Sequence, residues 1–256
     1  MNLILISIFL IVLIYYVNEK IIKINFLSNY TGYKHQKFAG LKNVPLSGGF
    51  FLICLYLIFF YFGNYNYLLA LFLFLIFCVG LIADINLLSS PKIRFLIQSI
   101  IIISFVFLLD IQIHQTKFIF LDILLRNVYF KYFFSIFCFL VLINGSNFID
   151  GLNGLMIGYF ISIISIIFYL NSYITLDIEN NLIIALLIIL AFLFILNLNN
   201  KLFMGDSGSY VLSLLCGYFL VKIYEMSLEI SPFFIVLLLW YPCFENLFSI
   251  IRKFTL

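Results

Sequence analysis

Long apolar stretches separated by short polar breaks run through the whole chain and decide what it can fold into. About 20 consecutive apolar residues cross a bilayer as a helix, whereas open strands would leave backbone groups without partners in lipid. Marking these stretches predicts about nine spans, over residues 2–17, 46–62, 66–83, 94–110, 129–146, 154–171, 181–197, 208–224 and 232–250. We therefore expect an all-α, polytopic transmembrane helix bundle.

The composition supports a protein embedded in lipid. Of 256 residues, 65% are hydrophobic and 10% are charged, whereas a soluble domain carries about 25% charged residues. No linker-like stretch divides the sequence, so residues 1–256 are interpreted as a single domain. The first apolar stretch lacks the basic start and the small-residue cleavage site of a signal peptide, and we expect it to remain as the first helix.

Lysine and arginine are unevenly divided between the loops that would lie on the two sides of the membrane. One side carries ten of the 14 cations: Lys20, Lys23, Lys34, Lys37, Lys42, Lys92, Arg94, Lys201, Arg252 and Lys253. The other side carries Lys117, Arg126, Lys131 and Lys222. Because cytoplasmic loops are enriched in cations, we expect the first side to be cytoplasmic, the N-terminus to lie outside, and the protein to reside in the plasma (inner) membrane.

Four polar segments fall on the predicted cytoplasmic side. They are His35-Gln36-Lys37-Phe38 with Pro45-Leu46-Ser47-Gly48-Gly49, Asp84-Ile85-Asn86 with Ser89-Ser90-Pro91-Lys92-Ile93-Arg94, residues 144–154, and residues 197–209. Each also has a plain structural interpretation. The Gly pair could serve helix packing rather than phosphate binding, and the other three could be a solvated loop, an interhelical turn and a helix cap.

Convergence of these segments favours a functional site. Asp84, Asp150 and Asp206 each lie at the cytoplasmic end of a predicted span, where a charge too deep in the helix would cost roughly 2.5–3.5 kcal/mol. Carboxylates and cations without a Cys or His cluster suit Mg²⁺ that holds phosphate. A transporter whose broken helix ends bind an anionic substrate is the alternative, although we find no inverted repeat and the polar groups gather at one interface.

Two motifs resemble signatures of a known family. Asn-Phe-Ile-Asp-Gly-Leu-Asn-Gly-Leu at 147–155 and Phe-Met-Gly-Asp-Ser-Gly-Ser at 203–209 are similar to those of the polyprenyl-phosphate N-acetylhexosamine-1-phosphate transferases, glycosyltransferase family 4. The segments at 35–38 with 45–49 and at 90–94 resemble two further family segments in the same order. The resemblance implies Mg²⁺-dependent (or Mn²⁺-dependent) transfer of a sugar 1-phosphate from a UDP-N-acetylhexosamine to polyprenyl phosphate, with release of UMP, at the start of cell-wall or lipopolysaccharide synthesis.

The resemblance also implies roles for individual residues. Asp84, Asp150 and Asp206 would be catalytic, and Asp206 with Asp84 would hold the metal ion. The substrate-binding set would comprise His35, Lys37, Lys42, Lys92, Arg94, Asn144, Asn147, Asn153 and Asn197. Within that set, the cations would contact phosphates, and Asn153 stands where the family often has Asp. No nucleic-acid partner is expected, and a homodimer stays open.

Two departures from the family pattern stand out. The family usually has adjacent aspartates at the end of the third span, whereas this chain has Ala83 before Asp84. A His-containing motif of a later cytoplasmic loop is also missing, since the sequence stops at Leu256. We therefore expect a C-terminally truncated sequence or an inactive homologue as the alternative to an active enzyme.

Overall fold

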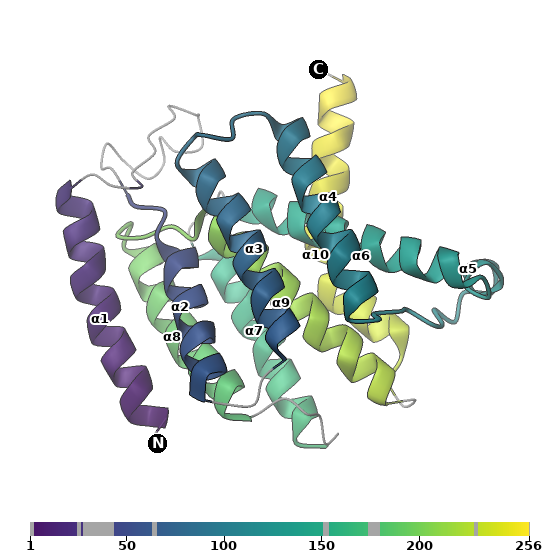
Figure 1. The fold of residues 1–256 in the computed structure, drawn as a ribbon, viewed down its shortest axis with the longest axis horizontal. Coiled ribbons are helices and arrows are strands. Elements are labelled where there is room, and N and C mark those ends of the chain that lie inside the picture. The colour runs from purple at the N-terminus through teal and green to yellow at the C-terminus, as the bar shows by residue number, and fades with distance from the viewer. Residues whose placement is uncertain are drawn as a thin grey trace.

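A computed structural model describes residues 3–24, 27, 44–62, 66–150, 154–173, 180–227 and 230–255. Every regular element in these ranges is a helix, which confirms the all-α prediction. The helices are α1 (Leu3–Ile24), α2 (Gly48–Phe62), α3 (Tyr67–Asp84), α4 (Pro91–Leu108), α5 (Ile119–Leu124), α6 (Val128–Ile149), α7 (Leu155–Asn171), α8 (Asn180–Leu198), α9 (Gly205–Met226) and α10 (Pro232–Thr255) (Figure 1).

Each of the nine predicted apolar stretches coincides with one of these helices, and the short α5 is an addition in a predicted loop. Among the described residues, six helices are long and apolar enough to cross a membrane, namely α3, α4, α6, α8, α9 and α10. Two shorter apolar helices, α2 and α7, accompany them. The chain is therefore a polytopic membrane protein, while nine crossings and an outside N-terminus remain predictions.

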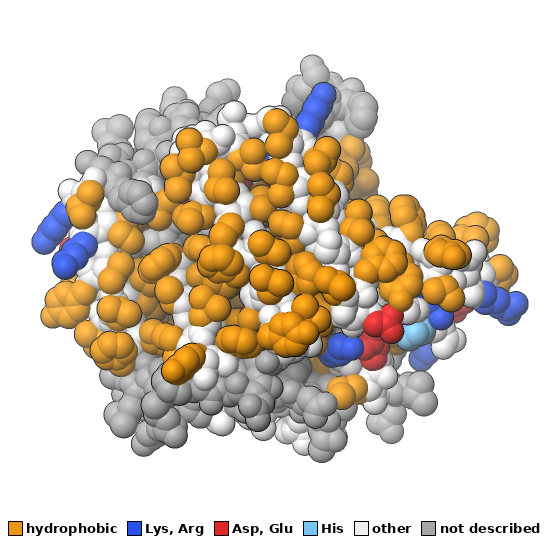
Figure 2. Space-filling view, in the orientation of Figure 1, with side chains coloured by type: hydrophobic (Ala, Val, Ile, Leu, Met, Phe, Trp, Pro, Cys, Tyr) orange, Lys and Arg blue, Asp and Glu red, His pale blue; other side chains and the backbone are white. Residues whose placement is uncertain are grey.

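Helix α9 forms the centre of the bundle. Its most apolar stretch is 78% buried inside the protein, against 11% for α10, and it packs against α2, α3, α6 and α7. In Figure 1 it passes behind α3. The face of the bundle seen in Figure 2, in contrast, is largely covered by hydrophobic side chains, as expected for contact with lipid.

Glycines let the start of α9 approach α2 and α3 closely. A Cβ atom on Gly80 of α3 would lie 2.3 Å from Cα of Ser207, and one on Gly49 of α2 would lie 2.4 Å from the backbone nitrogen of Gly208. Such distances are far below van der Waals contact, so neither position accepts a larger residue without movement of α9. The two glycines therefore set the depth at which α9 begins.

Pro242 lies inside α10 and joins that helix to two neighbours. A proline has no N–H, so it leaves the carbonyl four residues earlier without its helical donor. In this protein that carbonyl belongs to Leu238, and the hydroxyl of Tyr159 from α7 donates to it. On the other side, a Cβ atom on Gly145 of α6 would lie 2.0 Å from the carbonyl oxygen of Pro242. Helices α6, α7 and α10 therefore meet at Pro242.

Candidate active site

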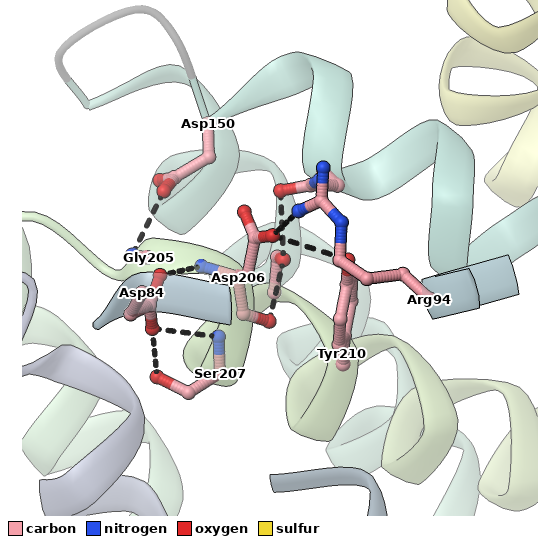
Figure 3. Close-up of polar contacts among 9 residues, drawn as sticks. Asp84, Arg94, Asp150, Gly205, Asp206, Ser207 and Tyr210 are labelled. Atoms are coloured by element: carbon pink, nitrogen blue, oxygen red, sulfur yellow. Dashed lines mark hydrogen bonds and ion pairs between the residues drawn. The ribbon is translucent and has the colours of Figure 1, made fainter. Parts of the chain in front are cut away.

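The first turn of α9 is capped by a residue from another helix. Met204 precedes the helix without a side-chain cap, and the carboxylate of Asp84, at the end of α3, takes that place (Figure 3). Its Oδ1 accepts the backbone N–H of Asp206 at 2.8 Å, and its Oδ2 accepts the backbone N–H and the hydroxyl of Ser207 at 3.1 and 2.7 Å. Asp84 is only 4% exposed, so it is a buried, tertiary helix cap.

A second carboxylate reaches the same turn from α6. Asp150 follows the last residue of that helix, and its Oδ2 accepts the backbone N–H of Gly205 at 2.9 Å. Gly205 has φ +71°, and a Cβ atom there would lie 2.7 Å from the nearer carboxylate oxygen of Asp84. Glycine is therefore required at the point where the two carboxylates meet the backbone.

Carboxyl groups outnumber basic side chains among the described residues of this site. Burial raises the pKa of the Asp150 carboxyl well above its ordinary value, the nearby carboxylates of Asp84 and Asp206 add to the increase, and the N–H of Gly205 opposes it. Among the described residues, Arg94 is the basic residue that pairs with these carboxyl groups. It lies in the first turn of α4, and its guanidinium forms an ion pair with Asp206 Oδ2. Three carboxyl groups thus share the site with one guanidinium, and either protonation of a carboxyl group or a bound cation would relieve the repulsion between them.

The side chain of Asp206 is held from several directions. The hydroxyl of Tyr210, one turn later on α9, donates to Asp206 Oδ2 at 3.3 Å. From α6, Asn147 lies within hydrogen-bonding reach of Asp206 and, at 3.4 Å, accepts a weak bond from the Ser209 hydroxyl. Unlike the buried Asp84, the Asp206 side chain keeps 21% of its surface exposed and remains open to a ligand, as does the partly exposed Asp150.

The structure brings together five of the predicted site residues: Asp84, Asp150, Asp206, Arg94 and Asn147. They come from the ends of four helices, which meet around the start of α9, whereas their place on the cytoplasmic side remains a prediction. Lys92 lies exposed in the first turn of α4, two residues from Arg94. His35, Lys37, Lys42 and Asn153 lie outside the described residues.

Two predicted substrate-binding asparagines form hydrogen bonds with the backbone. The amide of Asn144 donates to the carbonyl of Leu140 in its own helix at 2.8 Å. Asn197 is 2% exposed; its oxygen accepts the N–H of Gly154, and its nitrogen donates to the carbonyl of Leu202 at 2.9 Å. Asn197 therefore fixes the starts of α7 and α9 relative to each other, a positioning role, and direct substrate binding by either residue remains a prediction.

The Gly pair that opens α2 serves packing, as one of its two interpretations anticipated. The N–H groups of Gly48 and Gly49 donate to the carbonyls of Phe203 and Met204 at 3.1 and 3.3 Å. The N–H of Phe203 in turn donates to the carbonyl of Pro45 at 2.9 Å. These N–H groups are therefore engaged with the segment before α9 and are not directed at a phosphate.

Sequence reasoning missed two residues beside the cluster, Tyr210 and Gln98. Tyr210 lies four residues after Asp206, hence on the same helix face, and this spacing could have indicated it. Gln98 lies one turn after Arg94 on α4, is 1% exposed and adjoins Tyr210. Its amide atoms have no hydrogen-bond partner of acceptable geometry among the described residues. The sequence around Gln98 is an ordinary apolar helix pattern, so nothing in it marks this residue as part of a site.

The donor set fits a magnesium ion only in part. Among the described residues, no group of three or more His, Cys, Asp or Glu side chains converges as a metal cage, and the five cysteines are free. Mg²⁺ does not require such a cage, because it is commonly bound by one or two carboxylates together with substrate phosphates and water. Asp206 fits that role, whereas both oxygens of Asp84 already accept hydrogen bonds from the start of α9.

The fold and the site define a class: a multi-helical membrane protein with a carboxylate cluster and an arginine at one end of its helices. Comparison with protein families makes the assignment narrower. The model of glycosyl transferase family 4 matches residues 65–224, more than half of the chain and all five clustered residues. The protein belongs to this family, the polyprenyl-phosphate sugar-1-phosphate transferases. No curated protein matches the chain.

Proposed function

We propose that this protein transfers N-acetylhexosamine 1-phosphate from a UDP-sugar to polyprenyl phosphate and releases UMP. An oxygen of the lipid phosphate attacks the β-phosphorus of the UDP-sugar, and the bond from that phosphorus to the oxygen bridging the two phosphates breaks. The bridging oxygen leaves with UMP, and a lipid-linked sugar pyrophosphate remains. The family membership supports the transferase class and the lipid-phosphate acceptor.

One observation carries the proposal: a partly exposed carboxylate, Asp206, lies beside a guanidinium, Arg94, at the end of the bundle where α9 begins. Transfer between two phosphates depends mainly on positioning and on neutralising charge, since the nucleophile is already largely ionised near neutral pH. Asp206 would hold a Mg²⁺ or Mn²⁺ ion, which supplies that neutralisation. Arg94 and the exposed Lys92 would bind phosphate oxygens that the ion does not reach.

The remaining residues of the cluster would act on this pair. Asp84 and Asp150 hold the backbone of residues 205–207, so they fix where the Asp206 side chain leaves the helix. Asn147 lies at the end of α6 beside Asp206, in a position to hydrogen-bond the sugar or nucleotide. We assign the site to the cytoplasmic face of the inner membrane, because the cations of the sequence concentrate in the loops on that side.

A transfer assay tests the proposal. Membranes that contain the protein are incubated with polyprenyl phosphate, Mg²⁺ and a panel of labelled UDP-sugars, and both UMP and labelled lipid are measured. We expect equal amounts of UMP and lipid product with one UDP-N-acetylhexosamine, and neither product with Asp206→Asn. Absence of both products with every sugar would contradict the proposal, and movement of a substrate across the membrane without UMP release would favour the transporter.

A further inference from the structure

A short amphipathic projection lies at the end of α6 that is remote from the candidate active site. It comprises residues 113–133, which include the loop before α5, α5 itself and the first turns of α6, and we call it the α5 arm. Figure 1 shows it extending beyond the other helices. Helix α6 has 22 residues, or roughly 33 Å at 1.5 Å per residue, close to the thickness of a bilayer core of about 30 Å. The arm therefore lies at the other end of α6 from Asp150, and a helix of this length can reach from one membrane boundary to the other.

The arm exposes large apolar side chains although it is firmly held. Eight of them are between 39% and 83% exposed: Phe118, Ile119, Phe120, Ile123, Leu124, Val128, Tyr129 and Phe133. Two hydrogen bonds hold the backbone of the arm to the neighbouring helices α6 and α9. The N–H of Ile113 donates to the Ser135 hydroxyl of α6 at 3.0 Å, and the Tyr224 hydroxyl of α9 donates to the carbonyl of Gln115. Leu125, 1% exposed, anchors its other end. The tertiary contacts of the arm therefore hold its apolar side chains in an exposed position.

Charge is distributed on the arm as on a membrane-surface helix. Exposed Lys117 and Arg126 flank the apolar run of residues 118–124, while the acid in that run, Asp122, accepts bonds from the backbone N–H and the hydroxyl of Thr116 at 2.6 and 2.8 Å. In Figure 2 apolar side chains cover the arm and charged ones gather along its lower edge. Aromatic and aliphatic side chains beside free cations suit the boundary between acyl chains and phosphate headgroups.

We propose that the α5 arm is an interfacial anchor, which inserts its apolar side chains into the leaflet opposite the active site and binds lipid phosphates through Lys117 and Arg126. A six-residue helix cannot cross the membrane. A second copy of the chain fits less well, because a contact through this apolar surface would bury Lys117 and Arg126 of both chains, and a buried charge needs a partner. Within the arm, Asn127 caps the start of α6 by accepting the N–H of Tyr129 at 2.9 Å, and the far end of this same helix carries Asn147 and Asp150. The anchor therefore also fixes that helix in the membrane.

Tryptophan fluorescence tests the anchor. The sequence has one tryptophan, so Trp240→Phe gives a silent background for Ile119→Trp or, as a second probe, Phe120→Trp. Gln115→Trp, an exposed polar site of the same arm, is the matched control. Each full-length variant is placed in nanodiscs that hold one copy, and the emission is quenched either with lipids brominated near the headgroup or with aqueous iodide.

For residues 119 and 120 we expect several-fold stronger quenching by shallow bromolipid than by iodide, and the reverse for residue 115. Strong iodide quenching without a bromolipid effect at both apolar positions would overturn the proposal. So would shielding from iodide that appears only when a nanodisc holds two copies, which would identify a second chain as the occupant. The readout requires no transfer activity, so it is independent of the proposed function.

Discussion

The carboxylate of Asp84 accepts the backbone N–H of Asp206, 2.8 Å away and 122 positions later in the chain. A helix leaves its first N–H groups without internal partners, and α9 has them satisfied by side chains from α3 and α6 rather than by its own cap. Because α9 begins at the point where three other helices end or begin, this capping also sets the position of the carboxylate that we assign to the cation. Stability and function are therefore coupled at Asp84.

Replacing Asp84 with Asn should reduce both stability and turnover. An amide keeps one acceptor oxygen, so either the N–H of Asp206 or the pair of donors on Ser207 loses its partner. Loss of a buried hydrogen-bond partner costs about 1–3 kcal/mol, and thermal unfolding in detergent should measure it. We expect severe loss of transfer together with the lowered midpoint, whereas Ala83→Ser, one residue earlier, should be nearly silent. If Asp84→Asn unfolds at the wild-type midpoint and turns over at the wild-type rate, capping by Asp84 contributes to neither stability nor transfer.

Replacing Asp206 with Asn should abolish cation binding and leave the fold intact. The change removes the charge of a partly exposed side chain but keeps its size, and the backbone N–H of residue 206 can still donate to Asp84. Binding of Mn²⁺, followed by electron paramagnetic resonance, should weaken strongly, while the thermal midpoint should stay close to that of the wild type. Tyr210→Phe is the control, because it removes only a 3.3 Å contact to the same carboxylate; unchanged Mn²⁺ affinity in Asp206→Asn would contradict the assignment.

Arg94 should contribute geometry as well as charge. Its guanidinium offers several donors in a fixed plane, whereas a lysine presents a single ammonium. We expect Arg94→Lys to raise KM for the UDP-sugar clearly and Arg94→Gln to raise it further, with the unfolding midpoint little changed, because the Arg94 side chain is 25% exposed and such pairs stabilise proteins weakly. Steady-state kinetics of both variants measure this, and equal kinetics for wild type and Arg94→Gln would exclude phosphate binding by this residue.

The sequence was sufficient for the helices and for the meeting of the polar segments. Apolar length gives the spans, and alternate loops of a bundle lie on the same side, so Asp84, Arg94, Asp150 and Asp206 could be expected to meet. Their individual tasks were not predictable. Capping of α9 by Asp84 depends on how closely α9 packs against Gly80. The positioning role of Asn197 depends on its hydrogen bonds with Gly154 and Leu202. Both follow from tertiary packing, which leaves no periodic signal in the sequence.

The conformation of the α5 arm also could not be predicted from the sequence. Residues 111–128 fall between two predicted spans, so the sequence predicts a loop there. The structure instead ties this segment to α6 and α9 through Ser135 and Tyr224, and it contains a helix too short for a hydropathy window to separate from its surroundings. Contacts between side chains far apart in the sequence decided the conformation of this segment.

The last prediction concerns Tyr159 and the proline of α10. Tyr159→Phe leaves the carbonyl of Leu238 without a donor and should destabilise the protein by about 1–3 kcal/mol. Tyr169→Phe, which removes an exposed hydroxyl from the same helix, should have little effect.

A double-mutant cycle isolates the cause. Pro242→Ala restores an N–H four residues after Leu238, so the carbonyl regains a helical donor and no longer depends on the tyrosine. In that background Tyr159→Phe should cost much less than in the wild type, and the difference between the two costs is the coupling energy. Thermal unfolding of the four proteins measures it. If the two costs are equal, the tyrosine stabilises the bundle through packing, and the orphaned carbonyl of Leu238 is not the reason for its effect.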